Sequence, residues 1–374
     1  MPRFRNLAAG DPAPYATQRS PANPRYVLDS AAGRWLVLCF FHSAALPQAR
    51  AALTAAREMS GFFDDQKACF FGISTDPADE TEARVGNHVP GYRILWDADL
   101  TVSRAYGAAD MDSPDGPRRA LWVVIDPTMR VVDVIPFAPD GSDIARLGAC
   151  LDALPPPDRF AGLPLQAPIL YLPRVFEPDF CARLIDLYET QGGEISGFMR
   201  QIDGKTVGVN DPRHKSRRDV NIEDQALISE LQGRILRRVV PEIAKVHQFH
   251  VTRMERYLVA CYDAEEGGHF GAHRDNTTAG TAHRRFAVSV NLNDDFDGGE
   301  VSFPEYGPQS FKAPAGGAVV FSCSLLHAVS RVTRGRRFVF LPFLYDDAAA
   351  AIRDRNRHLI DTQTLAAARG GAAG

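Results

Sequence analysis

The sequence of residues 286–293 is Phe286-Ala287-Val288-Ser289-Val290-Asn291-Leu292-Asn293, in which large apolar side chains alternate with small or polar ones. Successive side chains of a strand point to opposite faces of its sheet, so the segment is predicted to be a strand with one apolar and one polar face. Antiparallel sheets often expose one face to water. The polar face therefore meets either solvent or a pocket that holds a polar ligand.

Further short strands are expected around this one. From Thr252 onward, runs with the same period of two are separated by turn-forming pairs: Gly267-Gly268, Asp294-Asp295, Gly298-Gly299, Gly307-Pro308 and Gly316-Gly317. Eight short strands with such turns predict an antiparallel double sheet, a double-stranded β-helix or jelly roll. Two supporting helices are predicted before it, one beginning at Glu177-Pro178-Asp179 and one spanning 224–246.

The N-terminal part has a different pattern, in which short apolar runs alternate with helical ones. The apolar runs are 35–41, 68–73, 120–125 and 131–136, and the helical patterns include 49–63 and 144–154. This alternation predicts an α/β sandwich. Three consecutive prolines, Pro155 to Pro157, favour an extended spacer after it.

These boundaries predict two domains. The expected parts are an α/β domain over 1–154, a Pro-rich linker over 155–167, a jelly-roll domain over 168–350, and a C-terminal helix and flexible tail over 351–374. A chain of 374 residues is long enough for two cores.

The composition is that of a soluble globular protein, with 45% hydrophobic and 24% charged residues, and excludes wholesale disorder. Lys and Arg number 42 against 46 Asp and Glu, a net charge of −4, which argues against a dedicated nucleic-acid binder. No apolar run approaches the ~18 residues that span a bilayer, and no signal core follows the start, so a cytoplasmic protein without a membrane partner is expected. The six cysteines form no CxxC pair and predict neither a disulfide framework nor a cysteine metal site.

The chain contains one His-x-Asp motif, His273-Arg274-Asp275, at the end of a predicted strand. Because side chains alternate, His273 and Asp275 point to the same face. His327 follows another apolar strand, 318–323. Two histidines and one carboxylate are the ligand set that leaves three positions of Fe(II) open, enough for a bidentate 2-oxo acid and O2.

A dicarboxylic cosubstrate needs a cation for its far carboxylate, and Arg337, ten residues after His327, offers a planar fork. Arg337 shares a strand face with Val339 and Leu341, which would bury its charge. Three other arginines of this segment reach water more easily: Arg331, Arg334 and Arg336.

Several segments in this order carry a resemblance that covers about half the chain. They are 257–262 (Tyr-Leu-Val-Ala-Cys-Tyr), 268–276, 291–294, 298–300, 303–304, 327–329 and 335–337. The set resembles the Fe(II)/2-oxoglutarate-dependent oxygenases of the prolyl 4-hydroxylase-like branch.

The resemblance implies iron at His273, Asp275 and His327, with the C5 carboxylate of 2-oxoglutarate on Arg337. It also implies that Tyr262 forms a hydrogen bond in the cosubstrate or substrate pocket. The polar strand face adds Ser289 and Asn291 as cosubstrate-binding candidates, although many relatives have an aromatic residue where this chain has Asn291.

The family's activity is hydroxylation of an unactivated C–H bond, coupled to decarboxylation of 2-oxoglutarate to succinate and CO2, with O2 consumed and ascorbate in support. The resemblance implies a small-molecule or peptidyl substrate, namely an amino acid, a peptide or a protein side chain, with proline as the leading candidate. Two alternatives remain: a nucleic-acid- or nucleotide-oxidising member of the superfamily, and a non-catalytic binding or scaffold protein with a vestigial metal site.

A basic segment, 213–219, precedes the predicted jelly roll. It is either a solvated loop or a lid over the iron, in which Arg217 or Arg218 would bind an anionic substrate.

The N-terminal part resembles the thioredoxin-like peroxiredoxins in order along the chain. The segments that carry the resemblance are 10–14, 35–41, 72–76, 96–97, 105–107 and 119–127. That family has Thr-x-x-Cys at the start of a helix, where this chain has Pro47-Gln48-Ala49-Arg50, and Arg119 matches the family's activating arginine. A non-peroxidase domain for docking, dimerisation or substrate presentation is therefore expected, with a homodimer or a protein partner bound through it.

Overall fold

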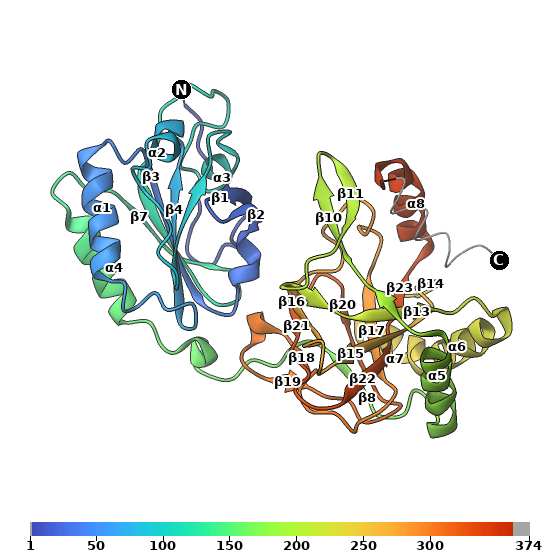
Figure 1. Ribbon diagram of the computed structural model, residues 1–374. Helices are drawn as coiled ribbons and strands as arrows, with labels where there is room; N and C mark the ends of the chain where they lie inside the picture. The colour runs from blue at the N-terminus through green and yellow to red at the C-terminus, as the bar shows by residue number, and fades with distance from the viewer. Residues whose placement is uncertain (1, 362–374) are drawn as a thin grey trace. The chain divides into compact units, whose positions relative to one another are not determined.

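A computed structural model describes residues 2–361 and divides into two compact units (Figure 1). The first comprises residues up to Gln166 together with Pro304–Pro308, and the second comprises the residues from Ala167 onward without that short segment. No helix within residues 2–361 is long and apolar enough to cross a membrane.

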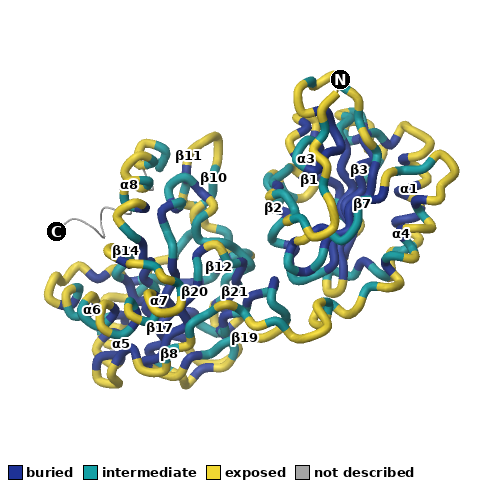
Figure 2. The backbone as a smooth tube through the Cα atoms, turned by 180° about the vertical axis from the view of Figure 1, so that it is seen from behind, coloured by how far each residue is buried: buried dark blue, intermediate teal, exposed yellow. Residues whose placement is uncertain are grey.

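The first unit is built on one seven-stranded sheet with the order β2-β1-β5-β4-β3-β6-β7. Its strands are β1 (Thr17–Ser20), β2 (Asn23–Val27), β3 (Trp35–His42), β4 (Ala68–Ser74), β5 (Tyr92–Trp96), β6 (Leu121–Ile125) and β7 (Val131–Pro136). Strands β3, β4 and β5 are parallel, whereas β6 and β7 are antiparallel to their neighbours. The inner strands β3 and β4 are buried along their whole lengths (Figure 2).

Two long helices cover one face of this sheet. The helices of the unit are α1 (Pro47–Glu58), α2 (Pro77–Thr81), α3 (Thr101–Ala105) and α4 (Ser142–Asp152). In Figure 1, α1 and α4 lie against the same face, and their apolar residues join Val37, Phe70 and Trp122 in one core. Pro47 occupies the first turn of α1, where a missing N–H costs no hydrogen bond.

The second unit is a pair of sheets. The smaller has the order β12-β16-β21-β18-β19, and the larger runs β14-β23-β17-β22-β15-β13-β9, with β20 and β8 attached through β17. Its strands are β8 (Leu170–Leu172), β9 (Glu194–Ile195), β12 (Lys215–Ser216), β13 (Arg218–Asn221), β14 (Arg253–Glu255), β15 (Leu258–Asp263), β16 (His269–His273), β17 (Phe286–Asn291), β18 (Val301–Ser302), β19 (Ser310–Phe311), β20 (Ala318–Ser322), β21 (His327–Val329), β22 (Arg336–Phe340) and β23 (Phe343–Tyr345). A separate hairpin consists of β10 (Phe198–Ile202) and β11 (Lys205–Val209).

Helices back the larger sheet. They are α5 (Pro178–Gln191), α6 (Gln225–Arg238) and α7 (Val240–His247), and their buried residues share a core with strands β15, β17 and β22. A last helix, α8 (Asp347–Asn356), follows β23. The predicted fold classes, a thioredoxin-like α/β unit and a jelly roll with supporting helices, are confirmed by this topology.

The predicted helical pattern over 49–63 is α1, which ends at Glu58, and one predicted helix is divided into two in the structure. A single helix over 224–246 was expected, but the chain forms α6 and α7 with a junction at Val239. Pro241 explains the break, because it has no N–H to donate and is favoured in the first turn of a new helix. The predicted tail lies outside the described residues from 362 onward, and the predicted domain boundaries stay a prediction.

Candidate metal centre and cosubstrate pocket

Two neighbouring strands bring the three candidate metal ligands together. His273 ends β16 and His327 begins β21, and these two residues are direct partners in the antiparallel pairing of the strands. Asp275 lies two residues beyond His273. One ligand atom from each of the three side chains lies within 4.8 Å of the others.

Both imidazoles present the same nitrogen to the carboxylate. His273 Nε2 lies 3.5 Å from Asp275 Oδ1, and His327 Nε2 lies 3.5 Å from Asp275 Oδ2. The other nitrogen of each ring donates to a backbone carbonyl, at 2.8 Å from His273 Nδ1 to Gly271 and 3.0 Å from His327 Nδ1 to Leu325. Because a carbonyl can only accept, the proton sits on Nδ1 and leaves the Nε2 lone pair for a metal.

Charge and burial favour the metal-binding protonation states. Burial alone would raise the pKa of Asp275, but His327 and His273 hold the pKa of this carboxyl well below its usual value. Burial lowers the pKa of His327 to about 4. A neutral imidazole and an ionised carboxylate are the forms that coordinate a metal ion, so the donor set fits Fe(II).

Aromatic rings enclose the histidines. The ring of Phe270 stacks on His273 with 3.5 Å between centroids, and Phe321 lies 4.6 Å from His327. These contacts fix the imidazole planes and exclude water from one side of the site.

Arg337 is buried in the same barrel, with 2% of its surface exposed. Its Nε donates to Asn291 Oδ1 at 3.0 Å and its Nη2 donates to Ser289 Oγ at 2.8 Å. The polar face of β17 is therefore turned inward, not toward solvent. Space for the guanidinium's stem comes from Gly299, where a Cβ would lie 3.0 Å from Arg337 Cδ.

Within residues 2–361 the guanidinium of Arg337 has no carboxylate partner. Burial lowers its pKa to about 10, which measures how poorly the interior solvates this charge. A buried cation bonded only to neutral groups is costly unless an anion binds to it. The position therefore suits the carboxylate of a ligand.

Tyr262 lies beside Arg337, since the two residues pair across β15 and β22. Arg217 reaches the same place: its Nη1 donates to Tyr262 Oη at 3.4 Å. Arg217 is 5% exposed and is held by Asp219, with 2.6 Å between Arg217 Nη2 and Asp219 Oδ2. Burial alone would lower the pKa of Arg217, but Asp219 raises it above its ordinary value.

The two predicted substrate-binding arginines, Arg217 and Arg218, differ in burial. Arg217 is turned into the barrel and already paired, whereas Arg218 is partly exposed and bonds Glu266 at 2.8 Å. The basic segment belongs to β12 and β13, strands of the barrel, and Lys215 within it is also buried. The binding of an anionic substrate by either arginine stays a prediction.

Asp219 and Lys215 were missed by the reasoning from sequence. The available signal was the alternation of Lys215, Arg217 and Asp219, which puts all three on one strand face. Lys215 Nζ donates to Ser196 Oγ at 2.8 Å and lies 5.1 Å from the centre of the Phe270 ring, the ring that stacks on His273.

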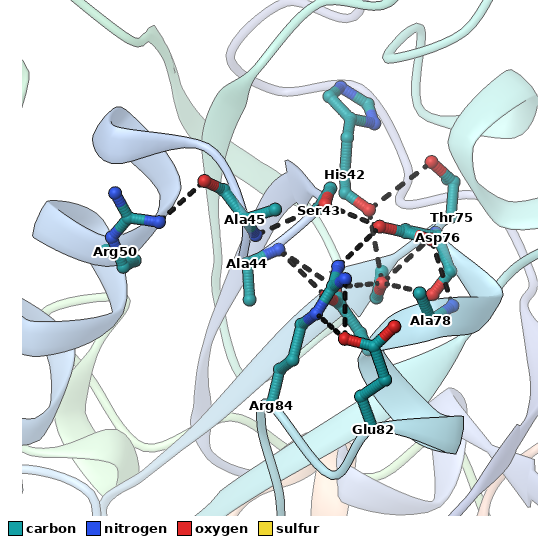
Figure 3. Close-up of polar contacts among 12 residues, drawn as sticks. His42, Ser43, Ala44, Ala45, Arg50, Thr75, Asp76, Ala78, Glu82 and Arg84 are labelled. Atoms are coloured by element: carbon teal, nitrogen blue, oxygen red, sulfur yellow. Dashed lines mark hydrogen bonds and ion pairs between the residues drawn. The ribbon is translucent and has the colours of Figure 1, made fainter.

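In the first unit, the segment between β3 and α1 is held by backbone contacts and carboxylates (Figure 3). The fully buried Asp79 accepts from the N–H of Ala44 at 2.9 Å and from Ser74 Oγ at 2.7 Å. Arg50, in the first turn of α1, donates to the carbonyl of Ala45 at 2.6 Å. No cysteine lies in residues 42–50.

The three cysteines of this unit are poor nucleophiles. Burial raises the pKa of Cys39 well above its usual value, that of Cys69 to about 11, and that of Cys150 above its usual value, so little thiolate forms. Arg119, the match to the activating arginine, lies against the Phe4 ring at 3.8 Å and donates to Asn6 Oδ1 at 3.0 Å.

Each part of the chain matches the model of a known family. The model of the 2OG-Fe(II) oxygenase superfamily matches residues 257–345, which contain all three candidate metal ligands and Arg337. The model of the AhpC/TSA family matches residues 9–134. Both predicted resemblances are therefore confirmed, and the oxygenase superfamily implies Fe(II) and 2-oxoglutarate.

Individual proteins are similar to parts of the chain. A PKHD-type hydroxylase of Bordetella pertussis is 36% identical over 148 residues, which cover 36% of this chain and 63% of that protein. The chain thus spans less than two thirds of this relative's length.

Solved structures resemble each unit separately. A Trichoplax adhaerens prolyl hydroxylase, solved with a hypoxia-inducible factor peptide, covers 49% of this chain and 86% of its own at 16% identity, with a TM-score of 0.41. Peroxidoxin BcpB of Mycobacterium tuberculosis covers 40% of this chain and 99% of its own at 24% identity, with a TM-score of 0.35.

Proposed function

We propose that this protein is an Fe(II)- and 2-oxoglutarate-dependent dioxygenase that hydroxylates an unactivated C–H bond. One observation carries the proposal: a cluster of two histidines and a carboxylate shares a barrel with Arg337, a buried guanidinium that no described carboxylate pairs. A metal and a dianionic cosubstrate together satisfy both features. A scaffold protein would need neither.

Each residue of the site has a distinct part in this reaction. Fe(II), 2-oxoglutarate and O2 together would supply the oxidising power for C–H hydroxylation, with succinate and CO2 as co-products. His273, Asp275 and His327 would hold the metal through Nε2 and carboxylate oxygens, while Arg337 would anchor the far carboxylate of the cosubstrate. The stacked ring of Phe270 shields one imidazole from water. Ascorbate is proposed as a supporting reductant.

The proposed substrate is an amino acid, a peptide or a protein side chain, with proline as the leading candidate. The resemblance of residues 257–262 and 273–276 to oxygen-sensing prolyl hydroxylases supports this choice. The net charge of −4 disfavours a nucleic-acid substrate.

Free proline and proline-containing peptides are expected to gain one oxygen atom when incubated with the protein, Fe(II), 2-oxoglutarate and ascorbate. Mass spectrometry detects the product, and reactions without 2-oxoglutarate are the control. Oxidation confined to nucleic-acid substrates, with binding that falls steeply with salt, would instead establish the nucleic-acid alternative.

We also propose that the N-terminal domain is not a peroxidase and serves docking, dimerisation or substrate presentation. The replacement of the reactive positions by Pro47-Gln48-Ala49-Arg50 and the high pKa of the buried Cys39 thiol support this role. A cytoplasmic location and a homodimer or partner protein bound through this domain are part of the same proposal.

The metal-free full chain is therefore expected to consume hydrogen peroxide, with dithiothreitol as reductant, no faster than the reductant alone. Peroxide loss followed optically would test this, with Cys39→Ser and Cys69→Ser variants as controls. Rapid consumption that disappears in one of these variants would show a working peroxidatic thiol.

A further inference from the structure

The contacts of Tyr262 determine the direction in which its hydroxyl forms hydrogen bonds. Tyr262 is 1% exposed, and two guanidiniums lie against its ring, with Arg337 Cζ at 5.4 Å and Arg217 Cζ at 5.7 Å from the ring centre. Among the described residues, its hydroxyl oxygen has one polar contact, Arg217 Nη1 at 3.4 Å. An arginine can only donate, so the Tyr262 oxygen accepts this bond and must direct its own hydrogen elsewhere.

Asp219 holds in place the side chain of Arg217, which donates to the Tyr262 oxygen. Arg217 Nε donates to Asp219 Oδ1 at 2.7 Å and Nη2 donates to Oδ2 at 2.6 Å, a bidentate pair. Ser196 Oγ accepts a further bond from Nη2 at 3.1 Å. These contacts occupy one edge of the guanidinium and leave Nη1 directed at Tyr262.

Two neighbouring donors beside this site each have no acceptor within residues 2–361. One is the hydroxyl hydrogen of Tyr262 and the other is Nη1 of Arg337, whose Nε and Nη2 are used by Asn291 and Ser289. The two side chains are cross-strand neighbours. Buried donors need acceptors, and a carboxylate accepts from both at once.

We infer that Arg217 is a positioning residue for cosubstrate binding: held by Asp219, it engages the Tyr262 oxygen so that the Tyr262 hydroxyl donates to the carboxylate that Arg337 binds. The inference rests on the proposed function and adds to it a role for the buried Arg217–Asp219 pair. The Arg217–Asp219 pair would thus support binding of the cosubstrate, and not binding of an anionic substrate.

The test is the dissociation constant of 2-oxoglutarate, measured by calorimetry without O2 on protein loaded with Mn(II) in place of Fe(II). The variants are Tyr262→Phe, the pair Arg217→Gln with Asp219→Asn, and the combination of all three. Exchanging both members removes the two charges of the bidentate pair together, so that Asp219, which otherwise keeps only Arg256 Nη2 at 3.4 Å as an ion-pair partner, is not left as a poorly paired buried charge. Arg336→Gln is the matched control, because Arg336 adjoins Arg337 but bonds Glu189 at the surface.

Tyr262→Phe and the Arg217–Asp219 exchange are each expected to weaken 2-oxoglutarate binding about tenfold, the loss of one hydrogen bond to a charged group. The combination is expected to be no weaker than Tyr262→Phe alone, because Arg217 acts through the hydroxyl that this change removes. Arg217→Lys, which keeps a cationic donor beside Asp219, is expected to bind more tightly than the exchanged pair.

The inference would be overturned if the triple variant lost affinity for 2-oxoglutarate by the product of the two separate losses. It would also be overturned if the exchanged pair bound 2-oxoglutarate as the wild type does, or if Arg217→Lys weakened binding as much as the exchanged pair. Each of these results leaves the proposed function standing. A wild-type protein that binds no 2-oxoglutarate would overturn both.

Discussion

His273→Ala is expected to abolish Fe(II) binding and all succinate formation. Loss of a group that merely orients a metal ligand typically costs about 10- to 100-fold in metal affinity, so loss of a ligand itself should cost more than about 100-fold. The remaining His327 and Asp275 would leave a two-ligand site. Fe(II) binding at equilibrium, measured without O2, and succinate release provide the two readouts.

His250→Ala is the matched control, because His250 is an exposed histidine of the same unit. It should bind Fe(II) as the wild type does. Undiminished Fe(II) binding in His273→Ala would show that the metal lies elsewhere, and circular dichroism would establish that the variant is folded.

Arg337→Gln should raise the KM for 2-oxoglutarate about 100-fold. Removing one partner of a buried charge pair costs about 2–5 kcal/mol, and each 1.4 kcal/mol is a factor of ten in binding. Glutamine keeps a polar group near Ser289 and Asn291 but carries no charge for the carboxylate. Succinate formation over a range of 2-oxoglutarate concentrations measures the change.

Arg336→Gln is the control here as well, because the Arg336 side chain bonds Glu189. Its KM for 2-oxoglutarate should equal that of the wild type. An Arg337→Gln protein with an unchanged KM would remove Arg337 from the cosubstrate pocket.

The fold classes could be predicted because both periodicities are strong in the sequence. The period of two in residues 286–293 marks β17, and its polar face proves to line the interior with Ser289 and Asn291. The alternation of strands and helices marks the first unit. Strands β1, β2 and β5 were not expected from the sequence. The short strands β1 and β2 are the last two of the sheet on one side and are partly exposed, so an apolar pattern does not mark them.

The cluster of candidate ligands was accessible to sequence reasoning because only one residue separates His273, the last residue of β16, from Asp275. The role of the Arg217 region was not. Its charges suggested a solvated loop or a lid, whereas β13 pairs with β15 and turns Arg217 and Asp219 into the barrel. The alternation of Lys215, Arg217 and Asp219 places them on one face, but whether that face is buried depends on which strand lies beside the segment, and the local sequence does not show that pairing.

The central claim is that His273, Asp275 and His327 with Arg337 form the site of an Fe(II)- and 2-oxoglutarate-dependent oxygenase. Its most direct test is succinate release from 2-oxoglutarate with Fe(II), O2, ascorbate and candidate amino acids and peptides, measured by mass spectrometry. Succinate is expected from the wild type and from neither His273→Ala nor, at 2-oxoglutarate concentrations near the wild-type KM, Arg337→Gln. Wild-type protein that binds Fe(II) and 2-oxoglutarate poorly and releases no succinate, or variants that release as much as wild type, would contradict the account.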